Sequence, residues 1–109
     1  MLNQVVLVGR LVKDLEVVKE EEKEVAYITI AVPRSYKNMD GEYETDFIDC
    51  ILWNGIATNT AEYCHKGDLL GIKGRLQTDI SNNGIKTTNV IAEKITFLSS
   101  RKTEETEEE

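Results

Sequence analysis

The hydrophobic pattern of this chain predicts β-strands along most of its length. In the run VAYITIAVP, every second residue from Ala26 to Val32 is apolar, and these residues would share one face of a strand. The first run, NQVVLVGRLV, is continuously apolar and rich in β-branched residues, which is typical of a buried strand. The pattern as a whole predicts five strands, over residues 3–11, 25–32, 45–53, 69–78 and 87–98.

The segments between these strands predict a helix and a charged loop. The sequence IATNTAEYCHKG predicts a short helix over residues 56–65, with Gly67 just beyond its end, where a C-terminal glycine belongs. The Glu-rich stretch that ends at Glu24 predicts a solvated turn or long hairpin loop. Pro33 has no N–H to donate, so it is expected to end the ladder of the second strand or to mark an edge.

Two further segments predict hairpins, and the order of the elements predicts the fold. Asn38, Asp40 and Gly41 are turn residues between two strands, and Asn83-Gly84 is a strong short hairpin signal. The order strand, strand, strand, helix, strand, strand is that of the all-β, five-stranded OB-fold barrel, with one short helix between strands 3 and 4. A small sandwich or an SH3-like barrel is the alternative, and the position of the helix counts against it.

Length and charge fit a single domain with an acidic end. The chain has 109 residues, of which we assign 1–99 to the barrel and 100–109 to a short acidic tail that is expected to be disordered. The formal charge is −7, and the tail and residues 16–24 each supply −3 of it. Only −1 remains for the rest of the chain, so a local basic surface is compatible with the acidic total.

The chain carries no predicted membrane or export segment. No run approaches the roughly 20 apolar residues of a membrane helix, and the N-terminus MLNQVVLVGRL lacks the features of a signal peptide. We therefore expect a cytoplasmic protein with no membrane partner. Cys50 and Cys64 are its only cysteines, and in a reducing compartment both are expected to be free thiols.

Four of the seven aromatic residues lie between Arg34 and Trp53, and strand alternation separates them from the core. Along the third predicted strand, every second residue from Ile48 to Leu52 is apolar and suits the barrel interior. Phe47 and Trp53 lie on the opposite face. The alternative is that these two aromatics pack under a loop or at a subunit contact, since a bulge would break the alternation.

Cations accompany the aromatic residues. Lys73 and Arg75 share the outer face of the fourth predicted strand, and Tyr36 lies in a hairpin arm with Arg34 and Lys37. Aromatic rings can stack on any nucleobase, at about 1–3 kcal/mol per base, while cations follow the phosphates. This combination predicts sequence-tolerant binding of single-stranded nucleic acid; the alternative for Lys73 and Arg75 is an ordinary solvated strand face.

No residue pattern predicts catalysis. His65 is the only histidine, and with the neighbouring Cys64 it gives no recognised zinc spacing. Carboxylates such as Asp46 and Asp49 are expected by chance in a charged chain, and no phosphate loop or nucleophile motif occurs. We therefore expect no catalytic residue, no metal site and no cofactor.

Three stretches together carry a family resemblance: MLNQVVLVGRL, VAYITIAVPRSYKNMDGEYETDFIDCILW and AEYCHKGDLLGIKGRLQT. Over residues 1–98 the chain resembles the bacterial single-stranded DNA-binding proteins, or SSB proteins. The resemblance implies an OB barrel that assembles as a homotetramer, binds single-stranded DNA in the nucleoid, and serves replication, recombination and repair.

The resemblance also implies a set of binding residues. In the family, aromatic residues at the positions matching Tyr36, Phe47 and Trp53 stack on bases. The basic residues expected to line the phosphate path are Arg10, Arg34, Lys37, Lys66, Lys73, Arg75 and Lys86.

The chain departs from the family pattern in two places. Family members usually carry an aromatic residue just after GRLQT, where this chain has DISNNG, so we expect weaker binding, a smaller footprint or a shifted path there. The tail RKTEETEEE ends in no apolar residue, which argues against recruitment of replication or repair proteins through its tip. The alternatives are a tail-less primosomal accessory protein of a phage or mobile element, and an OB domain that binds protein or carbohydrate.

Overall fold

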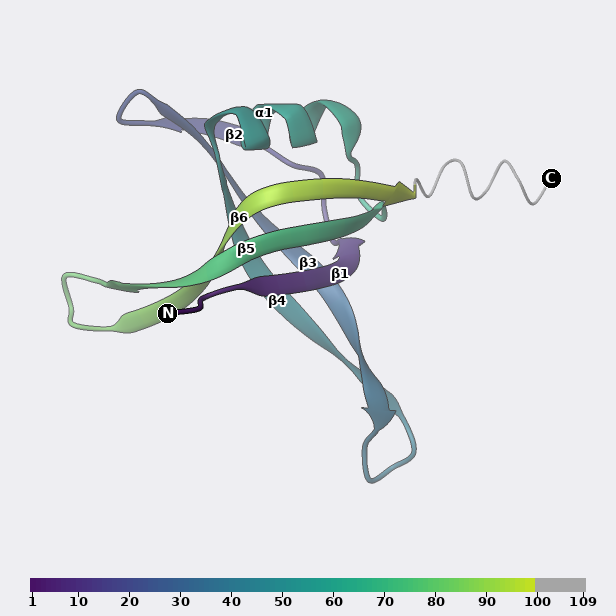
Figure 1. Ribbon diagram of the computed structural model, residues 1–109. Helices are drawn as coiled ribbons and strands as arrows, with labels where there is room; N and C mark the ends of the chain where they lie inside the picture. Colours follow the sequence, from purple (N-terminus) through teal and green to yellow (C-terminus); the bar gives the residue numbers. More distant parts are fainter. Residues whose placement is uncertain (100–109) are drawn as a thin grey trace.

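The computed structural model describes residues 1–99, which form six strands and one helix (Figure 1). No helix in this part of the chain is long and apolar enough to cross a membrane. The elements, in chain order, are β1 (Val5–Leu11), β2 (Val17–Glu20), β3 (Lys23–Lys37), β4 (Tyr43–Trp53), α1 (Asn54–Tyr63), β5 (Leu69–Ile80) and β6 (Lys86–Ser99).

Five of the strands close a barrel. The sheet has the order β1-β5-β6-β4-β3-β2, and β1 also pairs with β3 through Arg10 opposite Ala31 and Leu11 opposite Ile30. The pair β4–β6 is parallel and the other pairs are antiparallel. The helix α1 lies between β4 and β5 in the chain, which are the third and fourth strands of the barrel, so the predicted OB-fold is confirmed.

The barrel interior is filled by the inward face of each strand. Among the most deeply buried large side chains are Ile30, Leu52, Leu70 and Ile72, each at most 1% exposed. Gly74 is buried where β5 and β6 approach closely, and a Cβ atom there would collide with the carbonyl oxygen of Ile91. A core assembled from alternate residues leaves the other residues of each strand on the outer surface of the barrel.

The sequence predicted that the Glu-rich segment is a turn or a long hairpin loop, but part of this segment forms a strand. Residues 17–20 form β2, which pairs with β3 from Val17 opposite Ala26 to Glu20 opposite Lys23. Glu21 and Glu22 form the two-residue turn, with φ angles of 48° and 70°. The prediction failed because these glutamates replace the asparagine and glycine that usually announce such a turn.

Two hairpins extend beyond their predicted strand ends and project away from the barrel (Figure 1). The β3–β4 arm, defined here as residues 33–47, continues β3 through Pro33, where the pairing register shifts before Lys37. The β5–β6 arm, defined as residues 76–90, lengthens β5 to Ile80. Pro33 therefore marks an irregularity in the ladder and not its end.

The helix lies slightly earlier than predicted. It spans Asn54–Tyr63, and its C-terminal end is formed by the Cys64 N–H, which donates to the Thr60 carbonyl oxygen at 2.9 Å. Gly67 has a φ of 92° and does not cap the helix. It belongs instead to the next turn, in which the Asp68 N–H donates to the His65 carbonyl oxygen.

Candidate nucleic-acid interface

The strand β4 separates core from surface by alternation, as the sequence predicted. Cys50 and Leu52 are at most 1% exposed, whereas Phe47 on the opposite face is 66% exposed. Trp53 shares the face of Phe47 but is only partly exposed, and it lies opposite the fully buried Val25 of β3. Phe47 is thus the most accessible aromatic ring of the barrel wall, and the use of either ring for binding DNA stays a prediction.

One predicted cation lies in the same row of the sheet as Phe47. Arg10 of β1 pairs with Ala31 of β3, and Ala31 pairs with Phe47 of β4. The guanidinium of Arg10 donates to the Gly67 carbonyl oxygen at 2.9 Å, which brings it beside the loop that carries the exposed Lys66. The structure therefore places Arg10 and Lys66 together, on the β1 side of Phe47.

Arg75 lies on the other side of β4. It pairs with Ile91 of β6, and Ile91 pairs with Ile51 of β4, two residues before Trp53. The Arg75 Nε atom is 3.7 Å from a carboxylate oxygen of Glu93, and both side chains are about half exposed. This ion pair is loose and open to solvent, so a phosphate group could compete with Glu93 for Arg75.

Lys73 is exposed and has another lysine for a neighbour. It lies between Val6 of β1 and Lys94 of β6, directly opposite each. Lys94 was not among the predicted cations, because nothing in the local sequence indicates that it faces Lys73. Lys86 is far from this pair, at the start of β6 in the β5–β6 arm.

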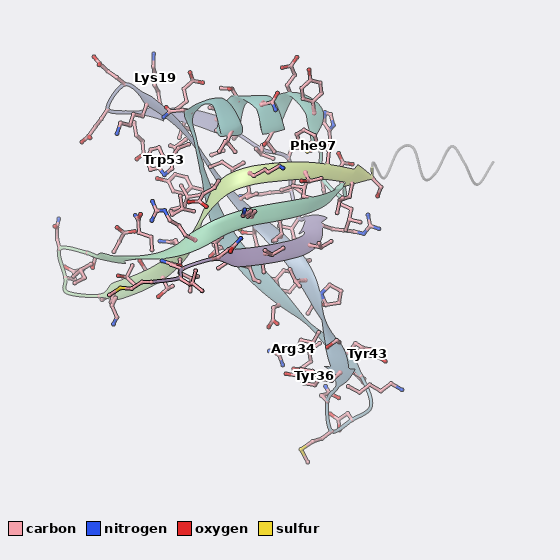
Figure 2. The ribbon with its side chains drawn as sticks, viewed as in Figure 1. Lys19, Arg34, Tyr36, Tyr43, Trp53 and Phe97 are labelled. Atoms are coloured by element: carbon pink, nitrogen blue, oxygen red, sulfur yellow. The ribbon has the colours of Figure 1, made fainter. Side chains whose placement is uncertain are left out.

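The third group of predicted residues lies in the β3–β4 arm, and Arg34 is its most strongly bound member (Figure 2). The Arg34 Nη2 atom donates to Asp46 Oδ1 at 2.9 Å, Nε contacts both Asp46 oxygens at 3.2 Å, and Nη1 donates to Glu44 Oε2 at 2.5 Å. The hydrogen bond from Arg34 lowers the pKa of the Asp46 carboxyl, and the reciprocal bond raises the pKa of Arg34. Arg34 is therefore already bound to two carboxylates, which a phosphate would have to displace.

The tip of the β3–β4 arm carries two exposed tyrosines on opposite sides (Figure 2). Tyr36 is 64% exposed and lies on the side of Arg34, whose raised pKa reflects Asp46 first and also Tyr36. Tyr43 is 60% exposed, and the Lys37 Nζ atom lies 5.7 Å from the centre of its ring. Sequence reasoning gave Tyr43 no role, because its stretch MDGEYET was predicted to be turn and loop.

Tyr27 is a second exposed aromatic ring of the barrel wall, and the sequence did not decide whether it belongs to the core or to a site. Tyr27 lies opposite Ile51 on the outer face of β3 and β4, and its side chain is 53% exposed. Its hydroxyl donates to Glu20 Oε2 at 2.8 Å, which raises the pKa of Tyr27. Glu20 places a negative charge beside this ring, which makes Tyr27 a poorer neighbour for phosphates than Phe47.

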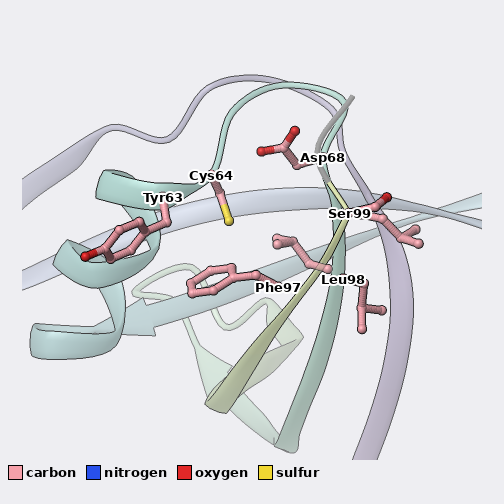
Figure 3. Close-up of a pocket in the computed structure, with 8 residues that line it drawn as sticks. Tyr63, Cys64, Asp68, Phe97, Leu98 and Ser99 are labelled. Atoms are coloured by element: carbon pink, nitrogen blue, oxygen red, sulfur yellow. The ribbon is translucent and has the colours of Figure 1, made fainter. Parts of the chain in front are cut away.

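One cavity in the described part of the chain contains a thiol. A cavity of about 210 Å³ lies between the end of α1 and β6, lined by Tyr63, Cys64, Asp68 and Phe97 among others (Figure 3). Burial, and then the charge of Asp68, raises the pKa of the Cys64 thiol to about 11. A protonated thiol is a weak nucleophile at neutral pH.

The second thiol is equally unreactive. Burial, and then Asp49, raises the pKa of Cys50 to about 12. Both cysteines are free thiols. Within residues 1–99, no group of three or more His, Cys, Asp or Glu side chains is placed to hold a metal ion.

The chain is similar to known proteins over nearly its whole length. The model of the single-strand binding protein family matches residues 2–98. The chain is 45% identical over 103 residues to single-stranded DNA-binding protein B of Bacillus subtilis, an alignment that covers 90% of this chain and 91% of that protein. It is 43% identical over 110 positions to single-stranded DNA-binding protein 1 of Streptococcus agalactiae serotype III, covering 96% of this chain and 68% of the relative.

Proposed function

The chain belongs to the single-strand binding protein family, and we propose that it binds and protects single-stranded DNA, without sequence preference, in replication, recombination and repair. The proposed role is that of a non-enzymatic binding protein that needs no cofactor. Bases stack on exposed aromatic rings, and lysine and arginine side chains neutralise the phosphates.

The observation that carries this proposal is the exposure of Phe47. Its ring is 66% exposed on the face of β4 that points away from the core, and Ala31 beside it is too small to cover it. Each stacked base contributes about 1–3 kcal/mol, and every base presents a flat π-face. We assign stacking roles to Phe47, Trp53 and Tyr36, with Phe47 as the most accessible of the three.

The cations are assigned to the phosphate path in three groups. Arg10 and Lys66 lie on the β1 side of Phe47, while Lys73 and Arg75 lie on the β5 side of the barrel. The remaining members of the proposed set are Arg34, Lys37 and Lys86. These cations lie on both sides of the aromatic residues of β4. A DNA strand that crosses β4 can therefore keep its phosphates near positive charge on either side.

We also assign the protein to the cytoplasm, associated with the nucleoid, as a homotetramer. Support for self-association comes from β1: within residues 1–99, residues 5–8 pair only with β5, so the other edge of this segment has no partner strand. On the same strand, Val6 is 70% exposed. Exposed apolar side chains beside an open strand edge favour pairing with another chain, and sedimentation of the full chain tests the assembly.

The acidic segment predicted over residues 100–109 lies outside the described residues. A role as a primosomal accessory protein of a phage or mobile element uses the same DNA-binding surface, so the experiment below tests that surface for both roles.

A titration with oligo(dT) tests the proposed function directly. Trp53 is the only tryptophan, so its fluorescence reports on the face that carries Phe47. We expect quenching on addition of oligo(dT), and the logarithm of the affinity should fall with log salt at a slope of about −0.7 per phosphate neutralised. Absence of both quenching and any salt-dependent binding at low ionic strength would reject DNA binding and favour an OB domain that binds protein.

A further inference from the structure

We propose that Tyr43 and Lys37 form a further base-binding position, on the face of the β3–β4 arm that also carries Phe47. This inference rests on the proposed function and adds a site within it. Tyr43 supplies the ring on which a base stacks, and Lys37 supplies the charge for the neighbouring phosphate. The occupant is one nucleotide of a single strand that extends from Phe47 toward the tip of the arm.

Strand alternation places Tyr43 with Phe47. Both lie on β4, four residues apart, so their side chains point to the same side, about 13 Å apart at 3.3 Å per residue. Lys37 is the pairing partner of Tyr43 and shares that side. Because the two rings are separated along the strand, they offer two positions for bases and not one cluster.

The surface between the two rings is open. Across the arm, Ala31 pairs with Phe47 and Pro33 pairs with Thr45, so only small or compact side chains lie between the rings. A groove of about 400 Å³ lies on this side, where β1 meets the base of the arm. Its lining includes Val8, Arg10, Ala31, Pro33 and Thr45.

The size and chemistry of this groove suit a nucleotide. Its volume falls within the roughly 300–1,000 Å³ that is usual for small-ligand sites. Its walls are mainly apolar, and Arg10 provides a positive charge at the end nearest the barrel. Lys37 provides a second positive charge at the tip of the arm. The face of the arm between Tyr43 and the barrel therefore has a cation at each end.

The opposite face of the arm has a different charge. There Arg34 is held by Glu44 and Asp46, a set that carries one positive and two negative charges. A phosphate that approached this face would meet carboxylates before it met an uncompensated cation. On the face of Tyr43, the Lys37 Nζ atom lies 5.7 Å from the centre of the ring. At the tip of the arm, the charges therefore favour the strand on the face of Tyr43.

Substitutions at the two arm tyrosines test the site, because both are exposed to a similar degree. The full chain is titrated with oligo(dT), with Trp53 fluorescence as the signal. Tyr43→Ala should weaken binding about 5- to 10-fold, the low end of the range for one stacked base. Tyr43→Phe keeps the ring and should bind within about twofold of the unchanged chain.

Two further measurements separate binding from a merely structural role. Lys37→Gln should reduce the magnitude of the salt slope by about 0.7, the value for one phosphate. Irradiation of the unchanged chain with an oligonucleotide that contains 5-iodouracil should produce a cross-link at Tyr43. Melting temperatures of all variants control for the fold, and the matched variant Tyr36→Ala reports on the other face.

The outcomes distinguish this site from the proposed function as a whole. If the unchanged chain binds no oligo(dT), the proposed function and this site are both rejected. If it binds, and Phe47→Ala weakens binding while Tyr43→Ala does not, the site alone is rejected.

Discussion

The two hairpin arms are closed by the same turn but carry different chemistry. In the β3–β4 arm, the Gly41 N–H donates to the Asn38 carbonyl oxygen at 3.0 Å, and Gly41 has a φ of 79°. In the β5–β6 arm, the Gly84 N–H donates to the Ser81 carbonyl oxygen at 2.9 Å, and Gly84 also has a φ of 79°. Each turn is a three-residue loop that ends in glycine, so the backbone does not distinguish the arms.

The side chains do distinguish them. The β3–β4 arm has three aromatic residues, Tyr36, Tyr43 and Phe47, whereas the β5–β6 arm has none over residues 76–90 and exposes Ile80 and Ile85 instead. An isoleucine has a hydrophobic surface but no flat π-face for a base. Of the two arms, the β3–β4 arm therefore carries the rings proposed to stack on bases, and substitutions on both arms test that asymmetry.

Phe47→Ala should have the largest effect on DNA binding. Loss of the most exposed ring of the barrel wall removes one stacking contact, which corresponds to about 1–3 kcal/mol or a 5- to 150-fold weaker affinity for oligo(dT). Because Phe47 is 66% exposed, the melting temperature should change little. The matched control on the other arm is Ile80→Ala at a 72% exposed position, and an equal loss there would abolish the asymmetry.

Ile80→Tyr should partly remove the difference between the arms by adding a ring to the β5–β6 arm. Tyrosine fits a strand as well as isoleucine does, so the arm should keep its backbone. We expect a gain of about fivefold in affinity for oligo(dT) from one added stacking contact. Ile80→Leu is the control without a ring. An unchanged affinity with Ile80→Tyr would show that bound DNA does not reach this arm.

Asp46→Asn should have a smaller effect, through the partners of Arg34. Asparagine cannot neutralise the guanidinium, so Arg34 becomes available to a phosphate while Glu44 still holds it in place. We expect the salt slope for oligo(dT) to steepen by up to about 0.7. The control is Glu42→Gln, which removes a charge of the same arm that has no bond to Arg34. If the salt slope steepens equally in this variant, the change in net charge alone explains the effect.

The ion pair also predicts a pH dependence. The hydrogen bond from Arg34 lowers the pKa of Asp46 below its ordinary value of 3.8. The ion pair therefore stabilises the arm at pH values above 3.8, and this stabilisation is lost as the pH falls through the lowered pKa of Asp46. A carboxyl titration by NMR should therefore place the midpoint of Asp46 below 3.8. In Arg34→Gln the midpoint should return to about the ordinary value; an unchanged midpoint would mean that the pair does not form in solution.

The sequence predicted the barrel better than the arms, and the hydrophobic core explains why. In the barrel, strict alternation from Ile48 to Leu52 identifies the buried face, and from it the exposed position of Phe47. Toward the tips of the arms neither face is buried, so Tyr43 carries no periodic signal and was assigned to a loop. The pairing of Arg34 with Asp46 depends on the register shift after Pro33, which no local pattern announces.

The turn of the short β2–β3 hairpin contains no glycine, unlike the turns of the two arms. Substitutions in this turn should affect the stability of the protein and not its affinity for DNA. Glu21 and Glu22 both have positive φ, a conformation that costs roughly 1–2 kcal/mol per residue for an ordinary side chain. Glu21→Asn combined with Glu22→Gly supplies the usual residues for this turn, so we expect about 1–2 kcal/mol of added stability. For a domain of this size that corresponds to a rise of roughly 4–15 °C in the melting temperature.

The control for this last prediction is Glu21→Gln with Glu22→Gln, which removes the same two charges without changing the cost of positive φ. If both double variants raise the melting temperature equally, charge repulsion in the turn is the cause and not the backbone. Affinity for oligo(dT) should stay within about twofold in both, because the two exposed charges that are removed each contribute well under 1 kcal/mol. A larger change would place bound DNA near β2, away from the arm that carries Tyr43 and Phe47.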